Sequence, residues 1–440
     1  IKVKSITIKY LSSPDTSLFN FISPLDLDKQ CKIVSPAQWV ENQKGKKTIS
    51  IKTLGKGTAL ILPSGLMVSL LDYSIKRRSF YSEFGQRLPT ERVSRISKGG
   101  IRNLILSGLK YLFQVRNLPF LHLWYFPQGN QTQFSFRVDT DFSSQKQVEE
   151  LYKMCGKHNL SATWFVETKS QADWIRYYRD MENQEIGYHC YRHRLFPGAG
   201  KNREDFEQGM SLMKKGKLRP EGYAAPYGEW YPGLARLVQE YNFTYSSEFG
   251  LAYDDFPFYP YVGDSFSSVL QIPIHPISTG SLRRARHSKE DMIDYYSKMI
   301  RIKQAVYEPI IFYHHPVHGY FDVFDTLFHI IRKQNIPVVS LGDFSQWWEK
   351  RTSFNWDPEI VKGRLHLHPS RMDSSIWIKI SLPSGKEILN PVSKQSHLLS
   401  GDYTVKAKQD FSHIDFKQLR QFNWRMWVHD FNHYWGKLKK

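Results

Sequence analysis

The feature that most constrains the fold is an alternation of strand-like and helix-like segments between residues 130 and 350. Short apolar segments typical of buried strands occur at 134–139, 162–166, 185–190, 222–227, 243–247, 270–274, 309–315 and 336–341. Segments with helical periodicity separate most of them, at 145–158, 170–183, 201–215, 231–241, 289–307 and 324–334. Such repeats predict parallel strands with the helices outside. No G-x-G-x-x-G follows the first strand, so we expect an α/β fold of the (β/α) barrel type, incomplete or distorted, rather than an open dinucleotide-binding sheet.

The length of 440 residues suggests two or three domains at about 150 residues each. We expect an N-terminal α/β accessory region at 1–128, a central domain at 129–351 that contains the strand–helix repeats, and a small β-rich domain at 352–440. The first region has strand-like segments at 48–53 and 58–62 and a basic helical stretch at 101–115, for which packing on a core is favoured over a membrane interface. In the last region, apolar and polar residues alternate at 364–368, 376–382 and 403–408, as in strands with one buried face. The region ends in a basic aromatic tail.

The charge balance favours an anionic partner. Lys and Arg number 61 against 42 Asp and Glu, a net charge of +19, which suits an acidic glycan, a lipid head group or a nucleic acid. No known nucleic-acid motif occurs, so we expect no nucleic-acid partner. The longest apolar stretches, 59–71 and 104–126, are interrupted by charges, Pro or Gly, so neither a transmembrane helix nor a signal peptide is expected. Two locations are consistent with these features, the cytoplasm and the periphery of a membrane.

Polar residues that can bind a metal follow several of the predicted strands. The first strand ends in Asp139-Thr140-Asp141, the third contains His189 and is followed by His193, and a later strand ends in His314-His315. In parallel α/β folds the carboxyl ends of the strands carry the functional site. Two histidines spaced i, i+4 can face one ion, and a carboxylate supplies a third ligand. A second carboxylate is then available as a general base, which is the pattern of hydrolytic metal sites.

These motifs resemble those of the polysaccharide deacetylase family, the metal-dependent N-deacetylases grouped as carbohydrate esterase family 4. The Asp139-Thr140-Asp141 pair resembles the family's first motif, and His189–His193 matches its H-[ST]-x-x-H motif with Cys190 at the small position. The segment Ala224–Tyr227 resembles the third motif, R-x-P-[YFW], and IIFYHHP resembles the last. Together these motifs span about half of the chain.

The resemblance implies a role for each residue. Asp139 would be the catalytic base, and Asp141, His189 and His193 would hold a divalent metal, with Zn²⁺ favoured. The backbone N–H of Tyr227 would stabilise the oxyanion. For the general acid, an alignment on F-Y-x-H-P selects His315 and one on L-x-H selects His314, and we favour His315.

One departure from the family pattern bears on activity. Ala224 stands where the family has the arginine that holds the base. Two interpretations follow. The favoured one is hydrolysis of an N-acyl group on an amino sugar of a cell-surface glycan or lipid-linked saccharide, with a possible peripheral membrane contact. The alternative is a catalytically silent deacetylase-like protein that binds glycan.

Overall fold

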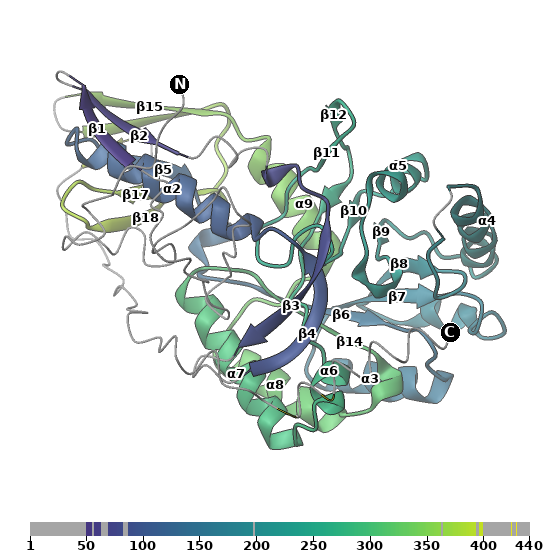
Figure 1. Ribbon diagram of the computed structural model, residues 1–440. Helices are drawn as coiled ribbons and strands as arrows, with labels where there is room; N and C mark the ends of the chain where they lie inside the picture. The colour runs from purple at the N-terminus through teal and green to yellow at the C-terminus, as the bar shows by residue number, and fades with distance from the viewer. Residues whose placement is uncertain are drawn as a thin grey trace.

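A computed structural model describes residues 50–54, 57–62, 69–81, 87–196, 199–361, 364–392 and 396–398, together with Trp424 and Val428. Its centre is a seven-stranded sheet in which every neighbouring pair is parallel (Figure 1). From one edge to the other it contains β13 (Leu270–Gln271), β10 (Tyr245–Ser246), β9 (Gly222–Tyr223), β8 (Glu185–Cys190), β7 (Ala162–Glu167), β6 (Phe134–Asp139) and β14 (Ile310–His314). The edge strands β13 and β14 are not paired with each other, so the predicted incomplete (β/α) barrel is confirmed.

Helices surround this sheet and follow its strands along the chain (Figure 1). They are α3 (Gln145–Lys157), α4 (Ala199–Lys215), α5 (Pro232–Glu240), α6 (Thr279–Arg284), α7 (Lys289–Ala305), α8 (Phe321–Lys333) and α9 (Leu341–Thr352). Three of them begin with a capping box, at Ser144, Ser288 and Ser340, in which the serine and the residue three positions later bond each other's backbone N–H. Local sequence thus fixes where these helices start.

Two predicted elements differ from the structure. Residues 170–183 form turns and a short 3₁₀ helix, η4 (Ile175–Asp180), instead of an α-helix. The Gln171 side chain hydrogen-bonds both the Thr140 carbonyl and the Tyr178 hydroxyl, which holds this segment in tight turns against the end of β6. Residues 336–341 make only an isolated parallel bridge between Val338 and Phe134, because Pro337 has no N–H to donate and α9 begins directly afterwards.

The N-terminal region packs against the central sheet. It contains β1 (Ser50–Leu54), β2 (Gly57–Ile61), the hairpin β3 (Ile75–Tyr81) and β4 (Arg87–Ser94), helix α2 (Lys98–Gln114) and β5 (Phe120–Leu123). Phe80 and Val93 of the hairpin belong to the same buried core as the central strands. Figure 1 shows the hairpin running along the front of the sheet.

Helix α2 packs on the protein, as predicted, with Ile101 and Leu104 buried. Several of its basic residues also point inward. Arg102 pairs with Asp255 at 2.5 Å, and Lys110 pairs with Glu387 at 2.6 Å. The ammonium of Lys98 donates to the carbonyls of Asp72 and Leu251. These cations are therefore used within the chain.

The C-terminal region is antiparallel, as predicted. Its strands are β15 (Trp356–Val361), β16 (Arg364–Pro369), β17 (Trp377–Ser381), β18 (Glu387–Pro391) and β19 (Ser396–Leu398). Strand β17 pairs with β5, so one small sheet joins strands from both flanking regions. The predicted strand at 403–408 lies outside the described residues, as does the basic tail apart from Trp424 and Val428. The two proposed domain boundaries, after residues 128 and 351, stay predictions. In the part of the chain that the structure describes, no helix has the length and apolar character needed to cross a membrane.

Candidate active site

The carboxyl ends of three parallel strands bring the predicted site residues together. Asp139 ends β6 and Asp141 follows it, His189 lies in β8 with His193 just beyond, and His315 directly follows β14. Because β6 lies between β7 and β14 and β8 lies next to β7, these strand ends are close neighbours in the sheet. Their positions follow from the order and direction of the strands.

Asp141, His189 and His193 form a cluster with the spacing of metal ligands. Their ligand atoms lie within 4.8 Å of one another. The Nε2 of His189 is 3.6 Å from Asp141 Oδ1, and the Nε2 of His193 is 3.8 Å from Asp141 Oδ2. Two ligands at about 2.1 Å from one ion lie at most about 4.2 Å apart. Both distances between Asp141 and the histidines are within this limit, as expected if the three side chains share one divalent cation.

The protonation of His189 also suits a metal ligand. Its Nδ1 lies 2.6 Å from the Ala224 carbonyl oxygen, and a carbonyl only accepts, so Nδ1 carries the proton. The other nitrogen, Nε2, then has a free lone pair. Nε2 and Asp141 Oδ1 are both buried without a hydrogen-bond partner among the described residues. Burial lowers the pKa values of His189 and His193 to about 4, which keeps both rings neutral and able to coordinate.

Asp139 is held by Arg137, two residues earlier on the same strand. The Nε of Arg137 donates to Asp139 Oδ1 at 2.6 Å and Nη2 donates to Oδ2 at 2.7 Å, a bidentate pair. Its third nitrogen, Nη1, donates to the Ser247 carbonyl. Burial is the largest influence on Asp139 and by itself would raise its pKa, but the charge and hydrogen bonds of Arg137, together with His189 and His315, outweigh burial and lower the pKa to about 2. Asp139 is thus an oriented carboxylate at neutral pH.

Arg137 was not assigned a role from the sequence, although a signal was present. Residues i and i+2 of a strand lie on the same face, so Arg137 and Asp139 had to project to the same side of β6. Ala224, where the family pattern has an arginine, is fully buried and contributes its carbonyl to His189. The cation beside Asp139 therefore comes from β6 itself.

The two adjacent histidines after β14 have different surroundings. His315 Nε2 lies 3.5 Å from Asp141 Oδ1 and 4.0 Å from Asp139 Oδ2. His314 is fully buried, hydrogen-bonds Thr279 and lies 4.5 Å from the Phe324 ring, centroid to centroid. Only His315 of this pair faces the two carboxylates.

Two exposed aromatic rings flank His193. Phe142 is 65% exposed and Tyr227 is 53% exposed, and their ring centroids lie 5.4 and 4.6 Å from that of His193. Both have a left-handed backbone, with φ of 59° and 60°. A bulky residue with positive φ is unusual and tends to occur at functional sites. Tyr227 lies in the turn η5 (Pro226–Gly228), and its hydroxyl donates to the His193 carbonyl.

The β3–β4 hairpin reaches the rim of the site. Arg92 pairs with Glu229, the residue after η5, at 2.7 Å. Glu91 accepts a hydrogen bond from Ser281 at the start of α6, and Arg284 lies 3.9 Å from the same carboxylate. Glu91 and Arg284 are also near enough to His315 to influence its pKa. The N-terminal region thus borders the site, which the sequence did not predict because these contacts join residues more than 130 positions apart.

Solved structures that resemble this chain include a polysaccharide deacetylase, carbohydrate esterases and a pseudoenzyme of the CE4 family. One, described as a polysaccharide deacetylase from Mycobacterium smegmatis, is 15% identical, with a TM-score of 0.42 over 51% of this chain and 92% of that one. A family 4 carbohydrate esterase from Streptomyces lividans is 12% identical, with a TM-score of 0.34 over 47% of this chain and 91% of that one. A CE4-family pseudoenzyme from Bacillus anthracis is 12% identical, with a TM-score of 0.37 over 62% and 90% of the two chains.

No protein-family model matches the chain, and no curated protein matches it either. The similar structures are those expected from the sequence motifs, and they include both enzymes and a pseudoenzyme. At these identities and TM-scores the likeness carries no argument about activity. The case for a function rests on the site itself.

Proposed function

We propose that the chain is a metal-dependent hydrolase that removes an N-acyl group, such as acetyl, from an amino sugar. One observation carries the proposal. A buried Asp-His-His cluster with metal-ligand spacing lies beside a second carboxylate, Asp139, that an arginine already holds ionised and oriented. This set combines the parts that amide hydrolysis by water requires.

Asp141, His189 and His193 would hold the divalent ion, with Zn²⁺ favoured for two imidazoles and one carboxylate. When bound, the ion supplies Lewis acidity that lowers the pKa of a water and polarises an amide carbonyl. The Asp139 carboxylate would accept the proton of the attacking water. His315 would donate a proton to the leaving amine, and the backbone N–H of Tyr227 would stabilise the oxyanion. The products are a free amine on the sugar and a small carboxylic acid.

The rim of the site supports a sugar as the substrate. Aromatic rings offer flat apolar surfaces on which the C–H faces of a sugar ring can pack, and Phe142 and Tyr227 expose two of them beside His193. The substrate class we propose is an N-acylated amino sugar of a cell-envelope glycan or a lipid-linked saccharide.

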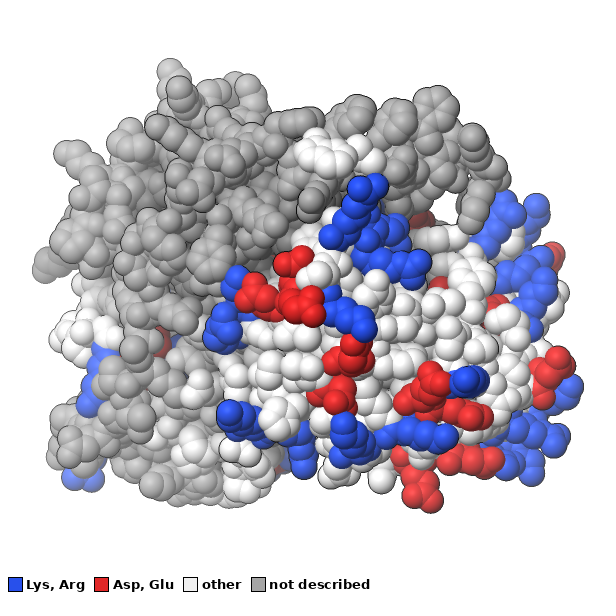
Figure 2. All heavy atoms as spheres, turned by 90° about the horizontal axis from the view of Figure 1, so that it is seen from below, with Lys and Arg blue, Asp and Glu red and all other residues white. Residues whose placement is uncertain are grey.

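A peripheral membrane contact would fit a lipid-linked substrate. The face shown in Figure 2 has basic and acidic side chains interspersed over its described part, without a continuous field of either sign. Because Lys98, Arg102 and Lys110 are used within the chain, such a contact would need other cations among the 61 in the sequence.

A second candidate function, a catalytically silent glycan-binding protein, was favoured by Ala224. The Arg137–Asp139 pair supports the enzyme instead, since the base has its cation from another position. Hydrolysis separates the two candidates, because a silent protein would bind sugar without releasing acid.

The metal assignment is tested by elemental analysis of the purified protein. The wild type should contain one divalent ion per chain, and the double variant His189→Ala/His193→Ala should contain none. Equal metal content in the two proteins would remove the basis of the proposal.

A further inference from the structure

The predicted metal ligand His189 is hydrogen-bonded to the peptide group that joins Ala224 and Ala225. Nδ1 of His189 donates to the carbonyl oxygen of that peptide at 2.6 Å. The N–H of the same peptide donates to Glu248 Oε1 at 3.0 Å. A single peptide group therefore links the imidazole to a carboxylate. All of these groups are buried, with His189 and Glu248 each 1% exposed.

The backbone at Glu248 is held by two side chains, whereas Oε2 of its carboxyl has no hydrogen-bond partner among the described residues. Its backbone carbonyl accepts from the Gln271 side-chain amide at 3.0 Å. The preceding carbonyl, of Ser247, accepts from Arg137, which holds Asp139. The segment after β10 is thus connected to two parts of the site. Ser247 is linked to the proposed base Asp139 through Arg137, and Glu248 is linked to His189 through the Ala224–Ala225 peptide.

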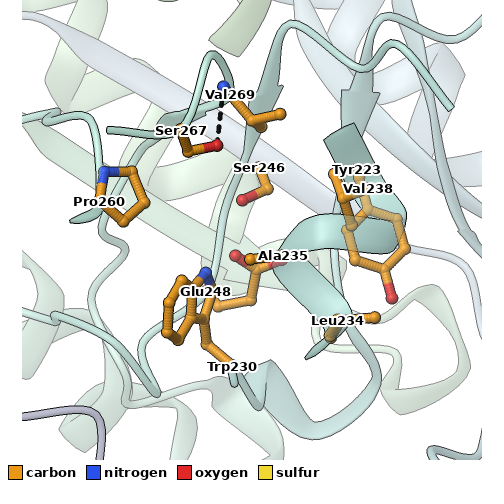
Figure 3. Close-up of a pocket in the computed structure, with 10 residues that line it drawn as sticks. All are labelled: Tyr223, Trp230, Leu234, Ala235, Val238, Ser246, Glu248, Pro260, Ser267 and Val269. Carbon is orange, nitrogen blue, oxygen red and sulfur yellow. Dashed lines mark hydrogen bonds between the residues drawn. The ribbon is translucent and has the colours of Figure 1, made fainter. Parts of the chain in front are cut away.

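Glu248 also borders a cavity of about 10 Å³, shown in Figure 3. The figure places its carboxylate between Trp230 and Ala235, with Ser246 and Ser267 among the other lining residues. A space of this size holds about one water. The carboxylate is therefore not enclosed by apolar side chains alone.

Hydrogen bonds in a chain polarise one another, and a carboxylate is a stronger acceptor than a neutral group. The Glu248 oxygen that accepts from the peptide N–H increases the electron density on the peptide oxygen, which strengthens its bond to His189 Nδ1–H. Burial raises the pKa of Glu248 to about 7, so this effect is larger above neutral pH, where the carboxylate is ionised. The outer partner of a metal-bound histidine fixes its orientation and raises its basicity, and its loss costs typically about 10- to 100-fold in metal affinity.

We propose that Glu248 is a positioning residue for the metal cluster and acts on His189 through the Ala224–Ala225 peptide. This inference rests on the proposed function only in taking His189 as a metal ligand. Glu248 is not one of the predicted metal ligands and would act on the metal only indirectly.

The test is the Zn²⁺ dissociation constant, measured by chelator competition on the full chain. Glu248→Leu removes the acceptor but leaves the Ala224 carbonyl on His189, so it should weaken Zn²⁺ binding about 10-fold, the lower end of the loss seen for a direct outer partner. Glu248→Gln keeps an acceptor oxygen without the charge and should give a smaller loss. Glu185→Gln is the matched control, because Glu185 bonds Thr163 and Tyr245 from the opposite end of β8, and its Zn²⁺ affinity should equal that of the wild type.

Thermal unfolding of the metal-free proteins shows whether each variant is folded before titration. If Glu248→Leu does not fold, the Zn²⁺ affinities of the other three proteins decide. Glu248→Gln should then bind Zn²⁺ more weakly than both the wild type and Glu185→Gln. Wild-type affinity in a folded Glu248→Leu or in Glu248→Gln overturns the role of Glu248 and leaves the proposed function intact. A wild-type protein that binds no Zn²⁺ overturns the proposed function instead.

Discussion

The two carboxylates that end β6 lie two residues apart and have opposite surroundings. Asp139 has a bidentate arginine, and its pKa is lowered to about 2. Asp141 faces the imidazoles of His189, His193 and His315, and burial raises its pKa to about 7. The protein pairs the first carboxylate with a guanidinium, whereas among the described residues no Lys or Arg side chain pairs with the second. This difference supports the proposed roles, because a base must stay ionised in the free protein, whereas a ligand would be balanced by its metal.

The largest effect should come from exchanging the two carboxylates separately for amides. Asp141→Asn should lose the metal, because it removes the charged ligand. Asp139→Asn should keep the metal and lose about 10²- to 10⁴-fold in turnover, the usual contribution of a general base. Metal content and acetate release, measured on the same samples, check both. The reverse pattern, with metal lost only in Asp139→Asn, would exchange the two roles.

His314 and His315, at the end of β14, differ in the same way, since only His315 is proposed as the general acid. His315→Ala should lower turnover about 10²- to 10⁴-fold and leave the free energy of unfolding close to that of the wild type. His314→Ala should instead cost about 2–5 kcal/mol of stability, because it empties a core position packed against Phe324. Denaturant unfolding and initial rates separate the outcomes. Stability loss in His315→Ala without loss of turnover would make His315 a structural residue.

The variant Arg137→Lys tests whether the proposed base Asp139 needs a fixed orientation as well as a nearby positive charge. Lysine keeps the charge but not the two parallel N–H donors, so Asp139 would stay ionised and lose its fixed orientation. We expect turnover to fall about 10²-fold, the size of effect seen when a catalytic group is misplaced by about 1 Å. Metal content should not change, and this distinguishes misplacement of the base from a damaged site. Unchanged turnover would show that the charge alone is sufficient.

The smallest expected effect concerns the net charge. If cations outside α2 contact a bilayer, sedimentation with anionic vesicles should occur at low salt and disappear at 1 M salt, where the Debye length is about 3 Å. Neutral vesicles are the control. A protein that stays in the supernatant with anionic vesicles at low salt would leave an acidic glycan as the anionic partner.

The sequence predicted the central sheet well because its strands are apolar segments with periodic helices between them. Strand β6 was predicted at its observed bounds. His189, His193 and His315 were predicted to lie together because the ends of parallel strands meet, and the structure brings them together around Asp141. Residues 170–183 and 336–341 were predicted wrongly, because periodicity captures neither the hydrogen bonds of the Gln171 side chain nor the missing N–H of Pro337. Glu248 could not be found from the sequence, because its link to His189 passes through a peptide group of a third segment.

Hydrolysis of an N-acetylated chito-oligosaccharide by the metal-loaded wild type tests the central claim most directly. Acetate release should require the divalent ion and should be lost in Asp139→Asn at equal metal content. Acetate release that persists undiminished in Asp139→Asn, or after complete removal of the metal, would contradict the assigned mechanism. A protein that holds one ion and binds the oligosaccharide without releasing acetate would instead be the silent glycan-binding form.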